Sequence, residues 1–506
     1  MKRSKLAIEF GLEHSFAEKL PEGYAEVWPA PVRTPMLLQF NRSLACDLGL
    51  DAETISDDVA ARIFSGNEMP CDAHPIAQAY AGHQFGNFVP QLGDGRAMLL
   101  GEVVDHRGLR RDIALKGSGP TPFSRGGDGK AAIGPVLREY LIGEAMHALG
   151  IPTTRALAAV ATGESVMRES ALPGAVLTRV AASHIRVGTF QFFAARRQFA
   201  QVKALADYVI ERHYPEAQHD EQPYLALLRK VVDRQAMLVA RWMQVGFIHG
   251  VMNTDNMTIS GETIDYGPCA FMDTYDPRTV FSSIDHGGRY AYGNQPSVAL
   301  WNLARFAETL LPLIAEVADE KANAEATAVL ETFVPTFQQH WYQRGLLKLG
   351  LGAPNQGAPN QPVIVGSLER ELIDDWHELM AENAVDYTLA WRHLAEAAEA
   401  CEAKLLSLFR TSEKIRVWLQ RWRELQKAVS PESLASAIRS HSPLYLPRNH
   451  LVEQALAAAT EENDLGPFEN LLRIVRQPYD ERPEYESYAT PASQEFTANY
   501  QTFCGT

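Results

Sequence analysis

The chain contains few cysteines and no long apolar run. Its five cysteines among 506 residues are too few and too scattered for a disulfide framework or a zinc site. No stretch approaches the roughly 18 consecutive apolar residues of a transmembrane helix. The basic start of the chain meets Glu9 and Glu13 before any apolar core of a signal peptide. We therefore expect a cytoplasmic, mostly reduced protein that does not bind membranes.

Basic residues are also in deficit. Lysine and arginine number 47 against 62 aspartates and glutamates, for a net charge of −15, which argues against non-specific binding to nucleic acid. Hydrophobic residues make up 46% and charged residues 22% of the chain, as in an ordinary globular protein of several domains. We expect a monomer that binds no nucleic acid.

The pattern changes along the chain from mixed α/β to helical. Helical periodicity is expected at 225–245, 297–320, 368–382, 385–410 and 413–427. Four parts are predicted: an irregular N-terminal extension (1–75) with short helices near 40–50 and 51–65, a small mixed α/β lobe (76–195), a large helical lobe (196–440) and a C-terminal extension (441–506). A tandem Gly-Ala-Pro-Asn-Gln repeat at 352–361 is expected to be a surface loop.

The stretch 249–267 lacks one residue that its pattern predicts. Kinase-type phosphate chemistry uses H-R-D-x-x-x-x-N followed by D-F-G. His249 takes the position of the histidine, Asn256 that of the asparagine and Asp265 that of the second aspartate, but Val251 stands where the catalytic aspartate belongs. The metal-binding half of the pattern is therefore present, and the usual base is missing.

Oxygen-bearing side chains in this stretch suit a metal and a proton acceptor. Mg²⁺ prefers one or two protein oxygens together with phosphate and water, and Asn256 and Asp265 supply such oxygens. A hairpin turn with a capping aspartate is the bland alternative for 263–267. Asp255 is a free carboxylate beside Asn256 and is predicted to act as the general base.

A lysine at the end of a predicted strand completes the kinase-like set. Ile113-Ala-Leu-Lys116 has the shape of the kinase V-A-I-K, whose lysine holds phosphate oxygens and pairs with a helix glutamate. A Gly-rich loop (117–130) and a helix (134–149) follow. Glu139 and Glu144 on that helix are both candidates for the partner, and Glu139 is favoured because it lies nearer the strand.

Further glycines and arginines are individually weak signals for phosphate binding. Two Gly-Asp-Gly turns, at 93–95 and 127–129, would form backbone nests for phosphate, although such turns are common in any protein. Arg96, Arg179 and Arg186 are candidate phosphate ligands. Structural ion pairs are an equally good explanation for Arg179 and Arg186.

Seven stretches together resemble one known family, the selenoprotein O (SelO/YdiU) pseudokinases. They follow in order along most of the chain, at 78–86, 90–97, 114–125, 177–190, 249–268, 446–455 and 478–480. The resemblance implies an α+β, protein-kinase-like bilobal fold in which ATP binds flipped, so that AMP is transferred to Ser, Thr or Tyr hydroxyls of proteins.

The same resemblance implies roles for individual residues. Asp255 would be the proton acceptor, and Asn256 and Asp265 would bind Mg²⁺, with Mn²⁺ as a possible substitute. The nucleotide would be bound by Asp265 and by eight further residues, Gly93, Gly95, Arg96, Lys116, Asp128, Gly129, Arg179 and Arg186. Animal members carry a redox motif near the C-terminus, of which only Cys504 has a counterpart here.

Three other functions stay open at this point. Transfer of UMP from UTP with Mn²⁺ is a close alternative, since nothing in the sequence reads the base. An inactive ATP-binding scaffold would explain the missing aspartate but not the retained metal ligands. An ordinary protein kinase is disfavoured because Val251 has no basic group.

Overall fold

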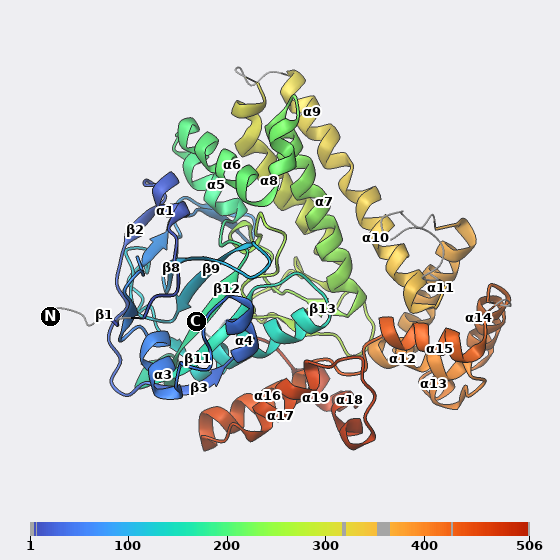
Figure 1. Cartoon of the computed structure of the whole chain (residues 1–506). Helices are drawn as coiled ribbons and strands as arrows, with labels where there is room; N and C mark the ends of the chain where they lie inside the picture. The colour runs from blue at the N-terminus through green and yellow to red at the C-terminus, as the bar shows by residue number, and fades with distance from the viewer. Residues whose placement is uncertain (1–4, 7, 316–319, 352–364, 427–428, 504–506) are drawn as a thin grey trace.

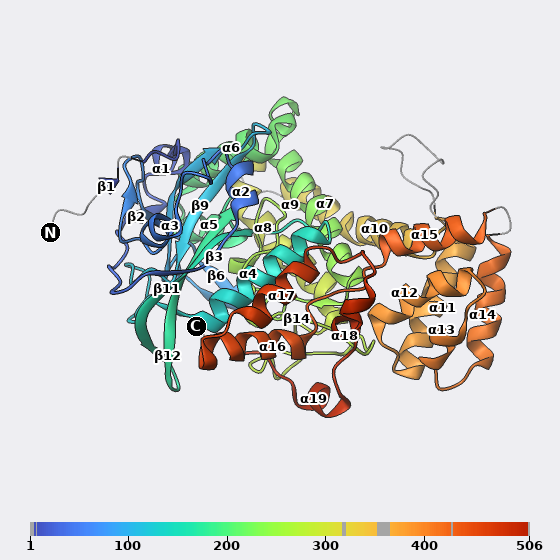
Figure 2. The ribbon, with the colours of Figure 1, turned by 60° about the horizontal axis from the view of Figure 1, so that its bottom comes forward.

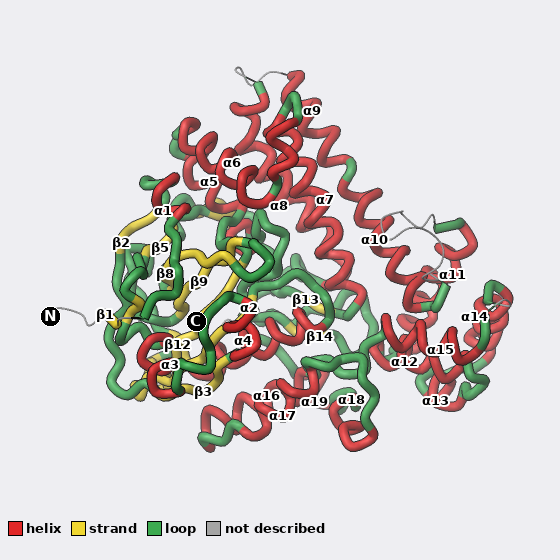
Figure 3. Tube along the Cα trace, in the orientation of Figure 1, coloured by secondary structure: helices red, strands yellow, loops and turns green. Residues whose placement is uncertain are grey.

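The computed structural model describes residues 5–6, 8–315, 320–351, 365–426 and 429–503. A sheet-rich N-terminal part is followed by a largely helical part, as Figure 1 shows in the change from blue and cyan to green, yellow and red. Figure 3 separates the same two parts by secondary structure, with the strands gathered on one side of the molecule. The mixed α+β class predicted from the sequence is confirmed. The tandem repeat at 352–361 and Cys504 lie outside the described residues.

An antiparallel sheet dominates the first 181 residues. Its strand order is β2-β5-β8-β9-β12-β11-β3, and β10 pairs with β12. The strands are β2 (Tyr24–Glu26), β3 (Met36–Phe40), β5 (Ile76–Gln78), β8 (Ala97–Val104), β9 (Arg110–Lys116), β10 (Ala131–Ala132), β11 (Arg155–Met167) and β12 (Ala171–Ala181). Three small two-stranded sheets are formed by β1 (Lys5–Leu6) with β4 (Met69–Pro70), β6 (Gly82–Gln84) with β7 (Asn87–Val89), and β13 (Phe247–Ile248) with β14 (Ala270–Phe271).

Helices fill most of the rest of the chain. In the first half they are α1 (Ser15–Lys19), α2 (Arg42–Asp47), α3 (Asp57–Phe64), α4 (Ile133–Ala148), α5 (Val187–Ala195), α6 (Phe199–His213) and α7 (Pro223–Gln244). The second half contains α8 (Gln295–Ile314), α9 (Glu320–Glu331), α10 (Phe333–Lys348), α11 (Ser367–Asn383), α12 (Tyr387–Ala398), α13 (Ala403–Ser407), α14 (Glu413–Glu424), α15 (Pro431–His441), α16 (Asn449–Ala457), α17 (Gly466–Val475), α18 (Glu486–Ala489) and α19 (Gln494–Asn499).

Alternation along β12 explains which side chains reach α4. Val176 and Val180 belong to the core that includes α3, whereas Leu177 belongs to the core that includes α4. Because side chains alternate between the two faces of a strand, Arg179 lies on the face of Leu177. Lys116 pairs in register with Leu177 and so shares that face. The sheet thus presents a lysine and an arginine on the side covered by α4.

Two predictions made for the chain need correction. The extension 1–75 is not irregular, because β2 and β3 form the two ends of the sheet order. The single helix predicted at 385–410 is two helices, α12 and α13. Ala400 lies between them with φ of 63°, a left-handed conformation that stops a helix.

The C-terminal elements return to the sheet-rich part. Figure 2 shows α16 and α17 lying along α4, and contacts between these three helices agree with the picture. The more distant helices continue the core that includes α4, and Trp376, Trp391, Trp418 and Trp422 are buried in it. Within the described residues, none of the helices combines the length and apolarity that crossing a membrane requires.

Candidate active site

One cavity of about 730 Å³ collects all the predicted site residues. It lies between the sheet, the loop 117–130, α4 and the stretch 251–268, and its lining includes Gly93, Gly95, Arg96, Lys116, Asp128, Gly129, Arg179, Arg186, Asp255, Asn256 and Asp265. These residues are spread over more than 170 positions of the chain, so the fold and not the local sequence brings them together.

Asp265 is surrounded by cations. Its Oδ1 accepts hydrogen bonds from Lys116 Nζ at 2.6 Å and from Arg179 Nη1 at 2.8 Å. Its Oδ2 lies 3.5 Å from Arg186 Nη2. Burial opposes ionisation, but the charges of Lys116, Arg179 and Arg186 outweigh it and hold the pKa of Asp265 well below its usual value. The backbone φ of 63° is also uncommon for a residue other than glycine. The surrounding cations therefore favour the anionic form of Asp265, which is held in a strained backbone conformation.

The predicted pair of Lys116 and a helix glutamate is confirmed in geometry. Lys116 Nζ donates to Glu139 Oε2 at 2.6 Å. Glu144, the other candidate, instead binds Arg155 and Arg476 from the far side of α4. Both residues are buried, and only Glu139 is directed at the cavity.

Arg179 and Arg186 are buried, with 1% and 2% of their surface exposed. Arg186 Nη1 lies 3.3 Å from Asp94 Oδ1, and its guanidinium stacks on the ring of Tyr80 at 4.4 Å. The guanidinium of Arg179 is also fixed through its Nε, which donates a hydrogen bond to His184 Nε2 at 3.2 Å. The ion-pair explanation for these arginines is thus correct in part, although both still line the cavity.

The hydrogen bond to His184 is one link in a longer chain. His184 Nδ1 lies 2.9 Å from Asp112 Oδ2, and Arg212 donates to the other oxygen of Asp112 at 2.6 Å. Burial lowers the pKa of His184, so the ring is neutral at pH 7. With Nδ1–H donating to Asp112, Nε2 is left as the acceptor that Arg179 requires.

Asp255 differs from Asp265 in having only one partner. Its Oδ2 accepts a hydrogen bond from Gln84 Nε2 at 3.2 Å, whereas Oδ1 is buried without a hydrogen-bond partner among the described residues. Burial raises the pKa of Asp255 to about 6. A buried carboxylate with a free oxygen and a pKa near neutrality is suited to accept a proton.

Glycine at position 82 allows the β6–β7 hairpin to approach Asp255. A Cβ added there would lie 2.6 Å from Asp255 Oδ1. The hairpin is fixed to the same loop by two further hydrogen bonds: His83 N donates to Thr254 Oγ1 at 2.7 Å, and Phe85 N donates to Asn253 Oδ1 at 3.0 Å. The position of Asp255 is therefore set by residues about 170 positions earlier.

Asn256 presents an oxygen for a metal ion. Its Nδ2 donates to Val251 O at 3.0 Å, which leaves Oδ1 as the free end of the amide. Together with Asp265 Oδ2 this makes two protein oxygens. No cluster of three or more His, Cys, Asp or Glu side chains is found in the described part. Two oxygens with phosphate and water are what Mg²⁺ uses, so the residues fit that ion better than zinc.

The glycine turns fold over the cavity, but Asp128 does not point freely into it. The loop 117–130 packs so closely that a Cβ at Gly93, whose φ is 83°, would lie 2.4 Å from the ring of Phe123. The carboxylate of Asp128 is bound to Arg168, at 3.0 and 3.2 Å. Asp128 therefore lines the cavity as half of an ion pair.

Four further residues that line the cavity were not predicted from the sequence to bind a ligand. Tyr80, Gln84 and Asp94 contact predicted site residues, as described above, and lie in motifs already noted at 78–86 and 90–97. Arg125 is different, because its side chain, like that of Arg96, has no hydrogen-bond or ion-pair partner in the part of the chain that the structure describes. Arg96 and Arg125 are the cations most readily available to phosphate.

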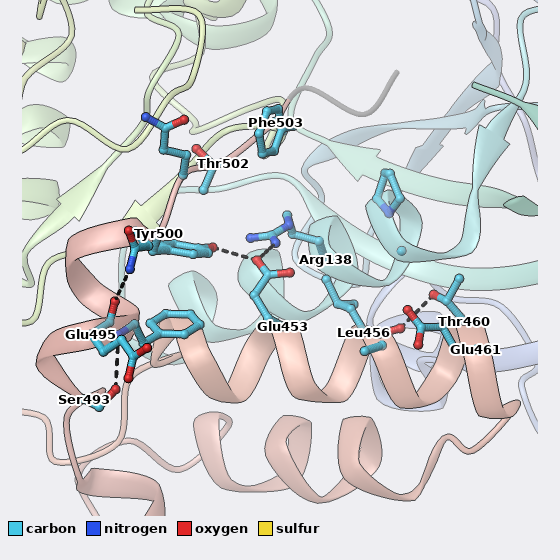
Figure 4. Close-up of a pocket in the computed structure, with 17 residues that line it drawn as sticks. Arg138, Glu453, Leu456, Thr460, Glu461, Ser493, Glu495, Tyr500, Thr502 and Phe503 are labelled. Carbon is cyan, nitrogen blue, oxygen red and sulfur yellow. Dashed lines mark hydrogen bonds and ion pairs between the residues drawn. The ribbon is translucent and has the colours of Figure 1, made fainter. Parts of the chain in front are cut away.

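A second cavity, of about 860 Å³, adjoins the first and shares Pro135 and Gly267 with it. Figure 4 shows it between α4, α16 and the C-terminal segment. Its one lining arginine, Arg138, is paired with Glu453, which also accepts a hydrogen bond from Tyr500 at 2.7 Å. None of the predicted site residues lines it, so the first cavity is the candidate active site.

Comparison with known proteins agrees with the motif resemblance. A family model described as protein adenylyltransferase SelO matches residues 7–476. A protein nucleotidyltransferase YdiU from Chromobacterium violaceum is 56% identical over 489 residues, covering 96% of this chain and all of the relative. Proteins with the same description from Rhizobium meliloti and Rhodopseudomonas palustris are 56% and 55% identical, over 98% and 99% of this chain and 99% and 100% of their own lengths.

Proposed function

The chain belongs to the SelO family of nucleotidyltransferases, and we propose that it transfers AMP from ATP to Ser, Thr or Tyr hydroxyls of protein substrates. One observation carries the proposal. Asp255, a buried carboxylate with a free oxygen and a pKa near 6, lines the same cavity as the cation-bound Asp265. A proton acceptor is thus present although the kinase position for it holds Val251.

The transfer step follows from these residues. The acceptor hydroxyl oxygen attacks the α-phosphorus, and the bond from that phosphorus to the bridging oxygen of pyrophosphate breaks. The hydroxyl proton passes to the carboxylate of Asp255, and pyrophosphate leaves with the electron pair of the broken bond. Lys116, Arg179 and Arg186 surround Asp265 in the same cavity, where they would stabilise the negative charge of the phosphates.

A divalent cation is part of this proposal. Asn256 Oδ1 and Asp265 Oδ2 would hold Mg²⁺, or Mn²⁺ in its place, and the ion would neutralise phosphate charge in the transition state. Because Asp265 Oδ1 is already bound by Lys116 and Arg179, only Oδ2 is available to the ion. The lysine and arginine thereby orient the ligand carboxylate.

The flipped orientation of ATP is supported by the distribution of cations. Arg96 and Arg125 lie on the loops at 93–96 and 117–130, and both lack partners among the described residues. An inverted triphosphate would extend toward these loops, where the glycine turns and the guanidinium groups receive the β- and γ-phosphates. Gly93, Gly95, Asp128 and Gly129 would complete that contact.

The wider architecture is proposed on the same basis. The sheet with α4 corresponds to the small lobe of a kinase-like bilobal fold, at about 76–195 with β2 and β3 added from the first 75 residues. The helices from 196 to 440 correspond to the large lobe. Residues 1–75 and 441–506 are extensions. We propose a cytoplasmic monomer whose partners are ATP and its protein substrates.

Intact-mass measurement after incubation with ATP and Mg²⁺ tests the proposed function. A gain of one AMP on the protein or on an added substrate is expected, and label from the α-phosphate should stay on protein. Product labelled only from γ-phosphate would show kinase chemistry instead. Competition between ATP and UTP, with Mg²⁺ and with Mn²⁺, decides between AMP and UMP transfer. Nucleotide binding with no mass gain on any substrate would indicate a scaffold.

A further inference from the structure

A separate cluster of cations lies where the C-terminal ends of α7, α10 and α15 meet. These helices surround a small cavity of about 20 Å³. Polar residues around it are Arg241, Gln244, Arg344, Lys348, His441 and Tyr479, and the remaining lining is aliphatic. Among the described residues, no aspartate or glutamate lines this cavity.

The three cations have no carboxylate partner. None of Arg241, Arg344 and Lys348 forms an ion pair with a described residue, whereas the buried Arg448 binds Asp273 and Asp386 within 2.7 Å. Unpaired buried charge is costly in a protein interior. The cluster, in which Lys348 is buried and Arg241 and Arg344 are half-buried, therefore differs from Arg448 in lacking a counter-charge.

Backbone carbonyl groups satisfy part of the cluster. Lys348 is 4% exposed and donates to Gln244 O at 2.5 Å, with the ring of Trp391 at 4.6 Å. Arg241 Nη1 donates to Gly150 O at 2.8 Å, but its Nε is buried without a partner in the described part. The side chain of Arg344 has no hydrogen bond to any described residue. Capping of helix ends thus accounts for two of the cations and leaves the third unexplained.

Repulsion between the cations contributes to lowering the pKa values of Lys348 and Arg344. Burial and then the charge of Arg344 lower the pKa of Lys348 well below its usual value. Burial and the charge of Arg241 lower the pKa of Arg344 to about 10. A bound anion would reverse both effects, because an opposite charge at close range favours the protonated forms.

We propose that this cavity binds one small inorganic oxyanion of the phosphate class. Planar guanidinium groups and an ammonium group are the usual ligands of such ions. A volume near 20 Å³ is far below the several hundred Å³ of a typical small-molecule pocket, so a nucleotide does not fit and only a small ion is admitted. The anion would lie among Arg241, Arg344 and Lys348, between His441 and Tyr479.

Binding at this position would join elements that reach the active site. The helix α7 leads directly into β13 and the loop 249–256, and α4, which carries Glu139, ends beside the cavity at Leu149. Side chains of α7, α10 and α15 would share one ligand. The expected consequence is a stabilisation of the folded chain that increases with the logarithm of the anion concentration once the site is mostly occupied.

Thermal unfolding of the full chain in inorganic phosphate, against chloride at equal ionic strength, tests the proposal. Phosphate should raise the Tm of the wild-type protein, and Arg344→Gln should weaken that binding at least about tenfold, because it removes a charge-assisted hydrogen bond. Arg344 is only partly buried, so this variant is expected to fold. Arg96→Gln is the matched control, since it removes an unpaired arginine from the active-site cavity instead.

The outcomes separate the two cavities. A phosphate shift that persists in Arg96→Gln and is reduced in Arg344→Gln supports the site. The proposal fails if phosphate gives no more stabilisation than chloride. It also fails if Arg344→Gln responds to phosphate as strongly as the wild type, because the ion would then be bound elsewhere.

Discussion

The stretch 249–267 holds two carboxylates, Asp255 and Asp265, in opposite environments. Asp265 contacts Lys116 and Arg179 within 2.8 Å, with Arg186 nearby, and its pKa is low. Asp255 has a single neutral partner, Gln84, and a pKa of about 6. Both line one cavity. The comparison shows how one residue type serves as a fixed anion at one position and as a proton acceptor at another, because the neighbours set the charge.

Asp265→Asn removes the fixed anion and should have the largest effect. Lys116, Arg179 and Arg186 would face one another with only Glu139 and Asp94 to balance them, and a metal ligand would be lost. We expect transfer to fall about a thousandfold or more and unfolding free energy to fall by about 3 kcal/mol. Transfer of α-phosphate label and urea unfolding measure the two effects.

The control for that variant is Asp58→Asn, which alters an exposed aspartate on α3 paired with Arg62. It should change stability by less than about 1 kcal/mol and leave transfer intact. Retention of full activity in Asp265→Asn would remove Asp265 from the proposed chemistry.

Asp255→Asn should reduce transfer about a hundredfold to ten-thousandfold, as expected for loss of a general base, yet stabilise the fold. The folded pKa of about 6 lies above the usual aspartate pKa of 3.8. The folded state therefore binds the proton more tightly, and ionisation of Asp255 costs up to about 3 kcal/mol of stability above pH 6. Urea unfolding at pH 7.5 should give a higher free energy of unfolding for Asp255→Asn than for the wild type. If Asp255→Asn lost as much stability as Asp265→Asn, ionised Asp255 would stabilise the fold as ionised Asp265 does, and the contrast between the two carboxylates would be wrong.

The pH dependence of transfer should report Asp255 and not Asp265. The base must be ionised, so the rate should rise about tenfold per pH unit below pH 6 and level off above it. Asp265 stays ionised throughout this range because its pKa is lower. Initial rates under saturating ATP, between pH 5 and 8, measure the profile. The residual activity of Asp255→Asn should lack the inflection near pH 6, and an unchanged inflection would assign it to another group.

Much of the site was predictable because kinase-like spacing is local. Asn256 and Asp265 follow His249 at fixed intervals, and Lys116 ends a strand whose residues alternate between two cores. The helices α4, α7, α11 and α14 were also found within a few residues, because their apolar periodicity is strong.

The remaining features depend on contacts between distant residues. Gln84 and Gly82 contact Asp255, which lies about 170 positions later in the chain. No pattern in either segment predicts that contact. Asp94 pairs with Arg186 in the same way. The cluster of Arg241, Arg344 and Lys348 has no motif at all, since two helices bring it together. Tertiary packing determines these contacts, and residues so far apart in one sequence show no spacing pattern from which the contacts could be predicted.

The smallest predicted effect concerns the residue behind Arg179. His184→Leu would leave Arg179 Nε buried without an acceptor, so the guanidinium would be less firmly directed at Asp265. We expect the KM for ATP to rise about fivefold to tenfold with little change in kcat, because the defect lies in positioning and not in proton transfer. His184→Gln retains an acceptor oxygen and should recover most of the loss. Equal impairment of the leucine and glutamine variants, or a change confined to kcat, would show that His184 does not act through Arg179. In that case Arg179 would be positioned by its ion pairs with Asp265 and Glu139 alone. Asp265 and Asp255 would then differ through the charges of their neighbours, with no contribution from the hydrogen bonds of His184 and Asp112.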